Sequence, residues 1–366
     1  MSDFSELTAT LEEFVTRYGA PGNDCVVYHH GKCVYRRQNG FSDAENRVPM
    51  SGTERYNIYS CSKLLTCTAA LQLLERGLYK LDDELADYMP EFAGMTVADG
   101  DTVRPAKRRI TIRNLFMMTA GFSYDVTSAN LLVAYREIPE MQTRAVMRYL
   151  ARDPLVFDPG DRWNYSLCHD VLAALVEVLS GQPFETYVRD NITEPLGMHQ
   201  TTFMLPEEEL GTIAPQYVYN VETGTRRRIG GEIWNYKLGP AYASGGAGGI
   251  STVDDYIKFL EALRTGDSIL KRETIDLMST DQLTESQRHT AWVAGGYGYG
   301  LGCRCRSALN PDDGPTDFGW GGAAGAYAAV DRVHGYTVFY AQHILASRVQ
   351  PRRGAIAGIV RRAIGG

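Results

Sequence analysis

The sequence has no long apolar run and few concentrations of positive charge. No segment approaches the roughly 20 consecutive apolar residues that a bilayer-spanning helix needs. The net charge is −7, and the one basic run, Arg226-Arg227-Arg228, follows a Gly-Thr turn and is expected to be a solvated loop. Nucleic acid and anionic membrane surfaces both require clustered basic residues, so neither is an expected partner.

Signals for export, bound metal and cofactors are also missing. Residues 1–22 contain no basic start, apolar stretch or small-residue cleavage site, which predicts a cytoplasmic protein. The seven cysteines are an odd number without a disulfide framework or a zinc-ligand spacing, so we expect free thiols. There is no Walker loop, dinucleotide fingerprint or His-Glu-x-x-His motif, and therefore no cofactor and no metal is predicted.

What the sequence does contain is an ordinary globular composition, with 44% hydrophobic and 22% charged residues in a chain of 366. Strand patterns occur near both ends of the chain, and helical patterns occupy the middle. The strand patterns cover residues 24–40, 297–305 and 323–343. The helical patterns cover residues 62–77, 110–121, 168–181 and 253–266, with a last helix at 354–364.

Two of these strand segments allow finer predictions. The tight turn at His30-Gly31 sets a register in which Tyr28 lies opposite Cys33, so Cys25 and Cys33 should not meet. Residues 297–305 carry glycine at alternate positions. This glycine face should let a neighbouring element approach closely.

This arrangement predicts an α+β fold, with an antiparallel sheet flanked by helices and built from both chain ends. A mostly helical lobe is inserted between them. We expect residues 1–84 and 267–366 to form the sheet domain and residues 85–266 to form the lobe. Small-molecule sites favour clefts between such units, so the active site is expected there.

The most informative candidate site is Ser60, which precedes Lys63 by three residues at the start of an apolar helix. This spacing turns both side chains to one helix face. A helix amino terminus stabilises a developing oxyanion, and a nearby lysine can accept or relay the serine proton. The same spacing recurs at Ser268 and Lys271 in a Gly-Asp-Ser turn, which we interpret as a surface loop.

The residues around Ser60 resemble the serine β-lactamase-like family, which includes class C β-lactamases, penicillin-binding proteins, D-aminopeptidases and related esterases. The resemblance covers most of the chain, with its motifs in order. It rests on IYSCSKLLTCTAALQLLERGLYKLDDELADYMPEF, ITIRNLFMMTAGF, FDPGDRWNYSLCHDVLAALVEVLSG, EPLGMHQTTF and AGGISTVDDYIKFLEAL. In the second of these segments, Met118 and Ala120 replace the usual His and Ser, so that segment is given no catalytic part.

The resemblance implies that Ser60 is the acylated nucleophile, Lys63 its partner and Tyr165 the residue that exchanges protons with the attacking and leaving oxygens. The third family motif corresponds to Trp320-Gly321-Gly322. This version is similar to that of the family's esterases. The backbone N–H groups of Ser60 and Ala323 are then expected to form the oxyanion hole.

Two departures from the family pattern bear on the substrate. Leu167 stands where an amide-binding Asn is common, and leucine can make no such hydrogen bond. Trp320 stands where Lys or His is common, which leaves no cation at that position for a substrate carboxylate. Both changes favour a small uncharged ester or lactone. Tyr124, Trp234 and Tyr236 are further candidates for substrate contacts.

The predicted function is therefore a serine hydrolase that acts through an acyl-enzyme on a small-molecule substrate, with carboxylesterase activity favoured. Three alternatives stay open. One is a β-lactamase or D-amino acid amidase or peptidase, another is an acyltransferase, and the third is a non-catalytic binding protein of the same fold. His169, four residues after Tyr165, and His343, at a strand end, are interpreted as structural, and no Gly-x-Ser-x-Gly triad context surrounds any histidine.

Overall fold

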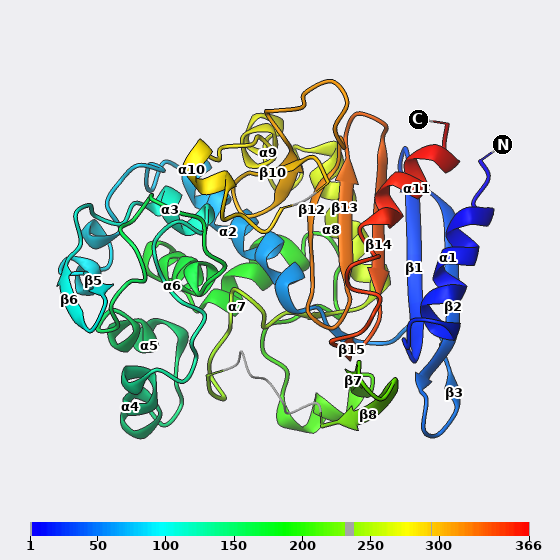
Figure 1. Cartoon of the computed structure of the whole chain (residues 1–366), viewed down its shortest axis with the longest axis horizontal. Helices are drawn as coiled ribbons and strands as arrows, with labels where there is room; N and C mark the ends of the chain where they lie inside the picture. The colour runs from blue at the N-terminus through cyan, green and yellow to red at the C-terminus, as the bar shows by residue number, and fades with distance from the viewer. Residues whose placement is uncertain (1, 231–237, 294, 366) are drawn as a thin grey trace.

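The computed structural model describes residues 2–230, 238–293 and 295–365. Within them, an eight-stranded antiparallel sheet has the strand order β10-β11-β12-β13-β14-β1-β2-β3 (Figure 1). Its strands come from the two ends of the chain, as predicted. They are β1 (Gly22–His29), β2 (Lys32–Asp43), β3 (Val48–Pro49), β10 (Tyr297–Tyr299), β11 (Arg304–Arg306), β12 (Phe318–Gly321), β13 (Tyr327–Asp331) and β14 (Tyr336–Ala341).

Helices cover both faces of this sheet, because its strands are apolar on both sides. Cys25 and Val27 of β1 belong to the core under α1 (Ser5–Thr16) and α11 (Ala355–Ala363). Val26 belongs to the opposite core, where α8 (Val253–Thr265) packs against β1, β13 and β14. This alternation is the two-residue period of a strand. The α+β fold with a helix-flanked antiparallel sheet is confirmed.

The remaining helices gather beside the sheet (Figure 1). Their centre is α2 (Ser62–Glu75), which packs against α6 (Cys168–Ser180) and β12. Every residue of α2 from Ser62 to Leu73 is buried, as expected of a helix that is apolar on all sides. The others are α3 (Ile112–Phe116), α4 (Ala129–Glu137), α5 (Thr143–Leu150), α7 (Phe184–Val188), α9 (Arg272–Met278) and α10 (Glu285–Arg288).

Three small sheets complete the described structure. They pair β4 (Tyr56–Asn57) with β9 (Ile250–Ser251), β5 (Thr96–Asp99) with β6 (Thr102–Pro105), and β7 (Gln216–Asn220) with β8 (Thr225–Ile229) and β15 (Ile344–Leu345). The division of the chain at residues 84 and 266 stays a prediction, and α8 lies before the second boundary yet packs on the main sheet.

The arginine run at 226–228 is not a loop, and that expectation was wrong. It lies in β8, whose backbone pairs with β7 while the arginine side chains stay exposed. Arg228 also contacts the carboxylate of Asp43 at 3.1 Å. Charged side chains are typical of exposed strands because they discourage further pairing, so solvation and strand structure are compatible here.

The predicted register and the close approach at the glycines are confirmed, but the single strand over residues 297–305 is wrong. The segment forms two antiparallel strands, β10 and β11, because Gly302, at a φ of 86°, allows a tight turn between them. Tyr28 pairs with Cys33 across the β1–β2 turn, and all seven cysteines are free. A Cβ on Gly298, Gly300 or Gly302 would collide with Asp281, the Met278 carbonyl or the Cys67 thiol, respectively. The glycines therefore allow the close approach that the pattern indicated. None of the helices in the described ranges is both long enough and apolar enough to cross a membrane.

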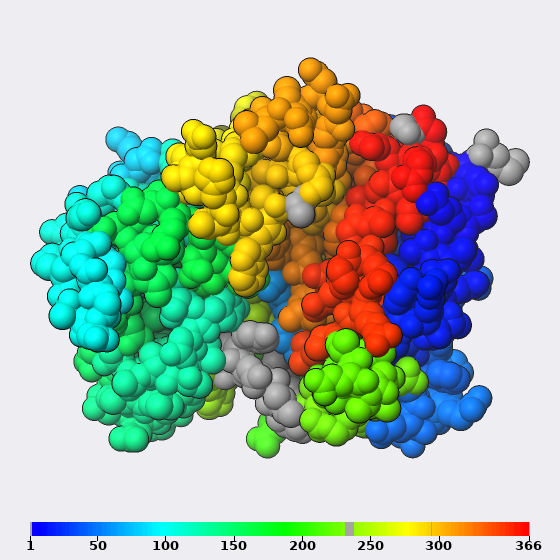
Figure 2. All heavy atoms as spheres, in the orientation of Figure 1, coloured from blue at the N-terminus to red at the C-terminus, as the bar shows by residue number. Residues whose placement is uncertain are grey.

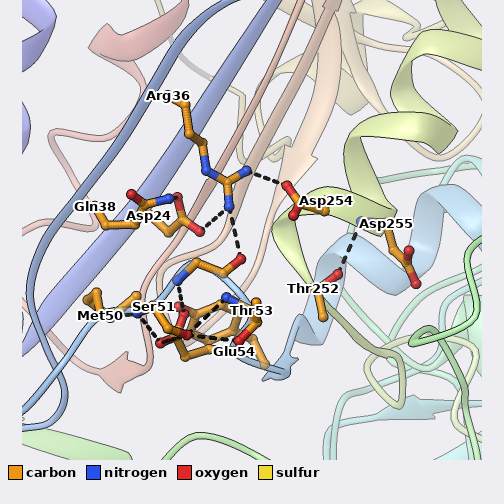
Figure 3. Close-up of polar contacts among 12 residues, drawn as sticks. Asp24, Arg36, Gln38, Met50, Ser51, Thr53, Glu54, Thr252, Asp254 and Asp255 are labelled. Atoms are coloured by element: carbon orange, nitrogen blue, oxygen red, sulfur yellow. Dashed lines mark hydrogen bonds and ion pairs between the residues drawn. The ribbon is translucent and has the colours of Figure 1, made fainter.

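An ion-pair network centred on the buried Asp24 ties α8 to strands β1 and β2 of the main sheet (Figure 3). Arg36 of β2 donates to Asp24 of β1 at 2.6 Å and to Asp254 of α8 at 2.7 Å. It also donates to the carbonyl of Gly52 at 3.1 Å. Burial raises the pKa of Asp24 to about 7, although the charge of Arg36 opposes this shift.

This raised pKa predicts a pH-dependent contribution to stability. The folded protein binds the Asp24 proton more tightly than the unfolded chain, in which the pKa is near 3.8. The contribution is therefore fully present below about pH 4 and is lost as the pH rises through about 7. We expect the free energy of unfolding of the wild type, minus that of Asp24→Asn, to decrease across this range in urea titrations. Gln38→Ala removes a hydrogen bond to Asp24 but not the titrating group, so it should keep the wild-type trend. A difference independent of pH would contradict the prediction.

Candidate active site

Ser60 lies in η1 (Tyr59–Cys61), a 3-10 turn that leads directly into α2. The preceding residue, Tyr59, has a φ of 47°, a conformation that is costly for a residue with a side chain and is common at functional sites. The fold holds it there: the Tyr59 hydroxyl accepts from Gln216 at 2.6 Å and its carbonyl accepts from Ser62 at 2.5 Å. Ser60 consequently reaches the floor of a cavity, with 9% of its surface exposed.

Lys63 is fully buried one turn further along α2. Its Nζ lies 3.4 Å from the Oγ of Ser60 and donates to the carbonyl oxygen of Gly246 at 2.6 Å. The helical spacing thus brings the two side chains together as predicted. The contact with Gly246, 183 positions away, is a product of the tertiary fold.

Tyr165 comes from the loop before α6 and hydrogen-bonds through its hydroxyl to the Oγ of Ser60. Its ring is stacked between Tyr124, at a centroid distance of 5.4 Å, and Trp292, at 5.1 Å. The Nζ of Lys63 lies 4.5 Å from the centre of the same ring, a cation–π geometry. Ser60 therefore has two groups within reach that can exchange protons with it.

The end of β12 forms another wall of the site. A Cβ on Gly322 would collide with the carbonyl of Ile58, and one on Gly321 would lie 2.6 Å from the guanidinium of Arg353. Glycine is therefore required at position 322 for the strand to pass this close to the turn that carries Ser60, whereas at position 321 the neighbour is a long side chain that can move. Trp320 packs edge-on against Tyr299 and roughly parallel to Tyr165.

Ala323 follows this strand and lines the cavity together with Ser60. Its carbonyl accepts a hydrogen bond from Gln350. Within the described part of the chain, its N–H donates to no other group. An N–H left available beside a nucleophile is suited to an oxyanion, and the pairing of Ala323 with Ser60 in an oxyanion hole stays a prediction.

The cavity has a volume of about 770 Å³ and opens on the face shown in Figure 2, between the yellow segment near residue 290 and the orange-red segment near residue 350. Blue atoms of the segment that carries η1 and α2 are visible at its floor. Its lining is strongly aromatic: Tyr124, Tyr165, Trp292, Tyr297, Trp320 and Tyr327.

Most of the predicted site residues converge on this cavity. Ser60, Tyr124, Tyr165 and the residues of the strand end from Trp320 to Ala323 line it, and Lys63 contacts Ser60 from beneath. Leu167 is 2% exposed and is not part of the lining, so its influence on the substrate stays a prediction. Trp234 and Tyr236 lie outside the described residues.

Sequence reasoning missed the other residues of the lining, and the three with the most chemical consequence are Trp292, Arg304 and Arg353. Position 320 has no cation, as the sequence shows, but the cavity as a whole does contain cations. Two arginines reach it from other parts of the chain. Arg304 of β11 pairs with Asp317 at 2.8 Å, and Arg353, just before α11, donates to the Gly322 carbonyl at 2.5 Å. None of the three belongs to a recognisable motif.

The two histidines interpreted as structural do not line the cavity. Burial lowers the pKa of His169 to about 3 and that of His343 to about 4, so both are neutral near pH 7. His169 contacts the Phe116 carbonyl and Cys67. Among the residues that the structure describes, no cluster of His, Cys, Asp or Glu could hold a metal ion.

Comparison with known proteins agrees with this geometry. The profile of the family described as Beta-lactamase matches residues 7–361. The chain is 30% identical to "Esterase EstB" of Burkholderia gladioli over 364 residues, covering 91% of this chain and 88% of that protein. It is 32% identical to "Acyltransferase mokF" of Monascus pilosus over 302 residues, covering 77% and 72%. The solved structure of "Simvastatin Synthase (LovD)" from Aspergillus terreus superposes with a TM-score of 0.83 at 25% identity, covering 99% of both chains.

The site geometry predicts that Ser60 is selectively reactive. A fluorophosphonate probe should label Ser60 covalently, since Lys63 and Tyr165 can remove its proton as the bond to phosphorus forms. Peptide mass spectrometry should find the label there and not on Ser268, which lies exposed in a loop. Ser60→Ala should abolish labelling, and Ser268→Ala, the matched control, should leave it unchanged. Label at Ser268, or none on the wild type, would refute the assignment.

Proposed function

This chain belongs to the Beta-lactamase family of serine hydrolases, and we propose that it is a carboxylesterase that forms an acyl-enzyme on Ser60. The observation that carries the proposal is the convergence of the Tyr165 hydroxyl and the Lys63 ammonium on one serine oxygen. This convergence lies at the floor of an aromatic cavity. The named similarity to an esterase over 91% of the chain supports the same reading.

In the acylation half-reaction, the Oγ of Ser60 forms a bond to the ester carbonyl carbon, and its proton passes to the oxygen of Tyr165, which enters the step as a phenolate beside the Lys63 ammonium and leaves it as a neutral phenol. The ammonium of Lys63, at 4.5 Å from the Tyr165 ring, offsets the charge that moves through this pair. The carbonyl oxygen becomes an oxyanion that the N–H groups of Ser60 and Ala323 bind. The bond to the alkoxide then breaks, and Tyr165 returns the proton so that an alcohol leaves.

Deacylation repeats these steps with water in place of Ser60. Water attacks the acyl carbon and gives its proton to Tyr165, and the Ser60 oxygen leaves with a proton from the same residue. The products are a carboxylic acid and the free enzyme. No further acid or base is needed, because the same pair serves both half-reactions.

The lining of the cavity supports a small apolar ester as the substrate. Tyr124, Trp292 and Trp320 surround Tyr165 and present ring faces and edges rather than hydrogen-bonding groups. The guanidinium groups of Arg304 and Arg353 are engaged by Asp317 and by the Gly322 carbonyl. An acyl chain therefore gains apolar contact area here.

Acyl transfer is a close second function. The supporting observations are the matches to proteins named as an acyltransferase and as simvastatin synthase. The half-reactions are identical except that an alcohol replaces water. Hydrolysis of a β-lactam or a D-amino acid amide is less well supported, because Leu167 cannot bind an amide and Trp320 supplies no cation for a carboxylate. A non-catalytic binding role is also less well supported, because it does not explain why Ser60, Lys63 and Tyr165 lie together. We also propose a cytoplasmic location, which the seven free cysteines support.

The proposed roles predict large and non-additive effects of substitution. Lys63→Ala and Tyr165→Phe should each lower kcat for p-nitrophenyl butyrate by about 10²–10⁴-fold, since each removes a proton carrier. The double variant should fall well short of the product of the two losses, because the residues act as one unit. Circular dichroism should show the fold intact. Turnover of Tyr165→Phe close to that of the wild type would overturn the mechanism.

The proposed substrate class predicts a preference between two chromogenic compounds. The kcat/KM for p-nitrophenyl butyrate should exceed that for nitrocefin by about ten-fold or more, because the amide and carboxylate of nitrocefin meet no matching groups at positions 167 and 320. Trp320→Lys should narrow the gap by supplying a cation, and Trp320→Phe, its apolar control, should not. If nitrocefin is the better substrate, the esterase proposal fails and Arg353 becomes the candidate partner of the carboxylate.

A further inference from the structure

Asp170 is a fully buried acid beside the proposed catalytic residues that the mechanism above does not use. It lies in the first turn of α6, five residues after Tyr165 and next to His169. Burial raises the pKa of its carboxyl group, while the Ser244 hydroxyl and the charge of Lys63 oppose the shift. A carboxylate without access to water requires partners, and its partners show what it does.

The two oxygens of Asp170 have different surroundings. Oδ1 accepts hydrogen bonds from the Ser244 hydroxyl at 2.7 Å and from the Tyr242 hydroxyl at 3.1 Å. Oδ2 is buried, and no side chain that the structure describes donates a hydrogen bond to it. The backbone N–H of Gly246 is the further group that helps to hold the carboxylate and opposes the rise in its pKa.

Gly246 lies beside both Oδ2 of Asp170 and the ammonium of Lys63. A Cβ on Gly246 would lie 2.5 Å from Oδ2 of Asp170 and 3.4 Å from Nζ of Lys63. The two charged groups are therefore at most about 6 Å apart, close enough to interact through a buried site although they form no direct salt bridge. The carbonyl of Gly246 accepts the hydrogen bond from Lys63.

The buried thiols and the imidazole that face Lys63 do not supply a negative charge near pH 7. Burial raises the pKa values of the nearby thiols and lowers that of His169 to about 3, which leaves all of them neutral. The phenols of Tyr124 and Tyr165 present ring faces to Nζ. The surrounding groups are Cys61, Cys67, Tyr124, Tyr165, Cys168 and His169.

We propose that Asp170 is the counter-charge of Lys63 and the positioning residue that keeps this lysine cationic in the buried site. The inference rests on the proposed function and specifies which side chain keeps a proton and which one accepts the proton of Ser60. Because the carboxylate holds a proton on Lys63, Tyr165 is the group that takes the proton of Ser60. Hydrogen bonds from Ser244 and Tyr242 hold the carboxylate of Asp170 in place. The carboxylate in turn holds the ammonium of Lys63 beside Ser60.

The test is the pH dependence of Ser60 labelling by a fluorophosphonate, measured as a second-order rate constant on wild type and Asp170→Asn. This reaction does not depend on the natural substrate. Asn keeps the shape of Asp170 and removes its charge. Loss of a nearby negative charge favours the deprotonated form of every neighbouring group, so both limbs of the profile should move to lower pH by roughly one unit. The maximum rate should fall about ten-fold or more.

Ser244→Ala is the matched control, because it removes a hydrogen bond to the same carboxylate but keeps the charge. Its limbs should stay within a few tenths of a pH unit of the wild type. A profile of Asp170→Asn that coincides with that of the wild type refutes the inference, even if the variant is slower or less stable. Failure of the wild type to label at Ser60 refutes the proposed function instead, so the two failures are distinguishable.

A second measurement does not require Asp170→Asn to be stable by itself. In Lys63→Ala the buried carboxylate loses its counter-charge, so Tm should fall, and adding Asp170→Asn to that variant should restore part of the loss. If Asp170→Asn alone does not fold, the Lys63→Ala, Asp170→Asn double variant should still fold. An equal loss of Tm in both backgrounds, or failure of the double variant to fold, would show a purely structural role and overturn the inference.

Discussion

The site depends on one buried ammonium group. Lys63 has no exposed surface, and an unpaired charge in such a place costs several kcal/mol. The fold offsets this cost through the Gly246 carbonyl at 2.6 Å and the Tyr165 ring at 4.5 Å. Each of these groups also has to be in place for Ser60 to react. The interactions that allow the lysine to be buried are therefore the same ones that build the site.

Several glycines make this burial geometrically possible. Gly246 lets its loop pack against Asp170 of α6, Gly322 lets the end of β12 pass the turn that carries Ser60, and Gly302 lets the segment after β10 rest on Cys67 of α2. A side chain at any of these points would separate elements that must touch. At Tyr59 the backbone has a positive φ although the residue is not glycine. Hydrogen bonds to its hydroxyl and to its carbonyl hold it in this conformation. The close approach of β12 at Gly322 and the strained backbone at Tyr59 together place Ser60 at the cavity floor.

The aromatic wall links this chemistry to substrate choice. Tyr165 is stacked on Tyr124 and Trp292, so the ring to which we assign proton transfer is also part of the cavity lining. Trp292 is 70% exposed, unusual for a large apolar side chain and typical of a binding surface. Under the proposed function, the same rings offer an apolar contact surface for an acyl chain.

Local patterns in the sequence were sufficient to predict the main helices and strands and the contact between Ser60 and Lys63. The spacing of Ser60 and Lys63 on a helix, the β1–β2 register and the glycine face of residues 297–305 each depend on residues close in sequence, where backbone geometry leaves few choices. The helix at residues 62–77 was predicted for the same reason. The arginine run at 226–228 was missed as a strand although it pairs with β7 in a local hairpin, because three successive exposed arginines lack the apolar alternation that marks a half-buried strand.

The tertiary structure alone decided what surrounds the nucleophile. The hydrogen bond of Tyr165 to Ser60 joins residues 105 positions apart, and the position of Tyr165 had been indicated only by a family resemblance. Trp292, Arg353 and Asp170 carried no signal at all, because their approach to the site depends on how α6, α11 and the intervening loops pack. Short-range geometry determines which elements form, since it is set by the backbone. Long-range contacts decide the chemistry, since burial and charge pairing exist only after those elements have packed together.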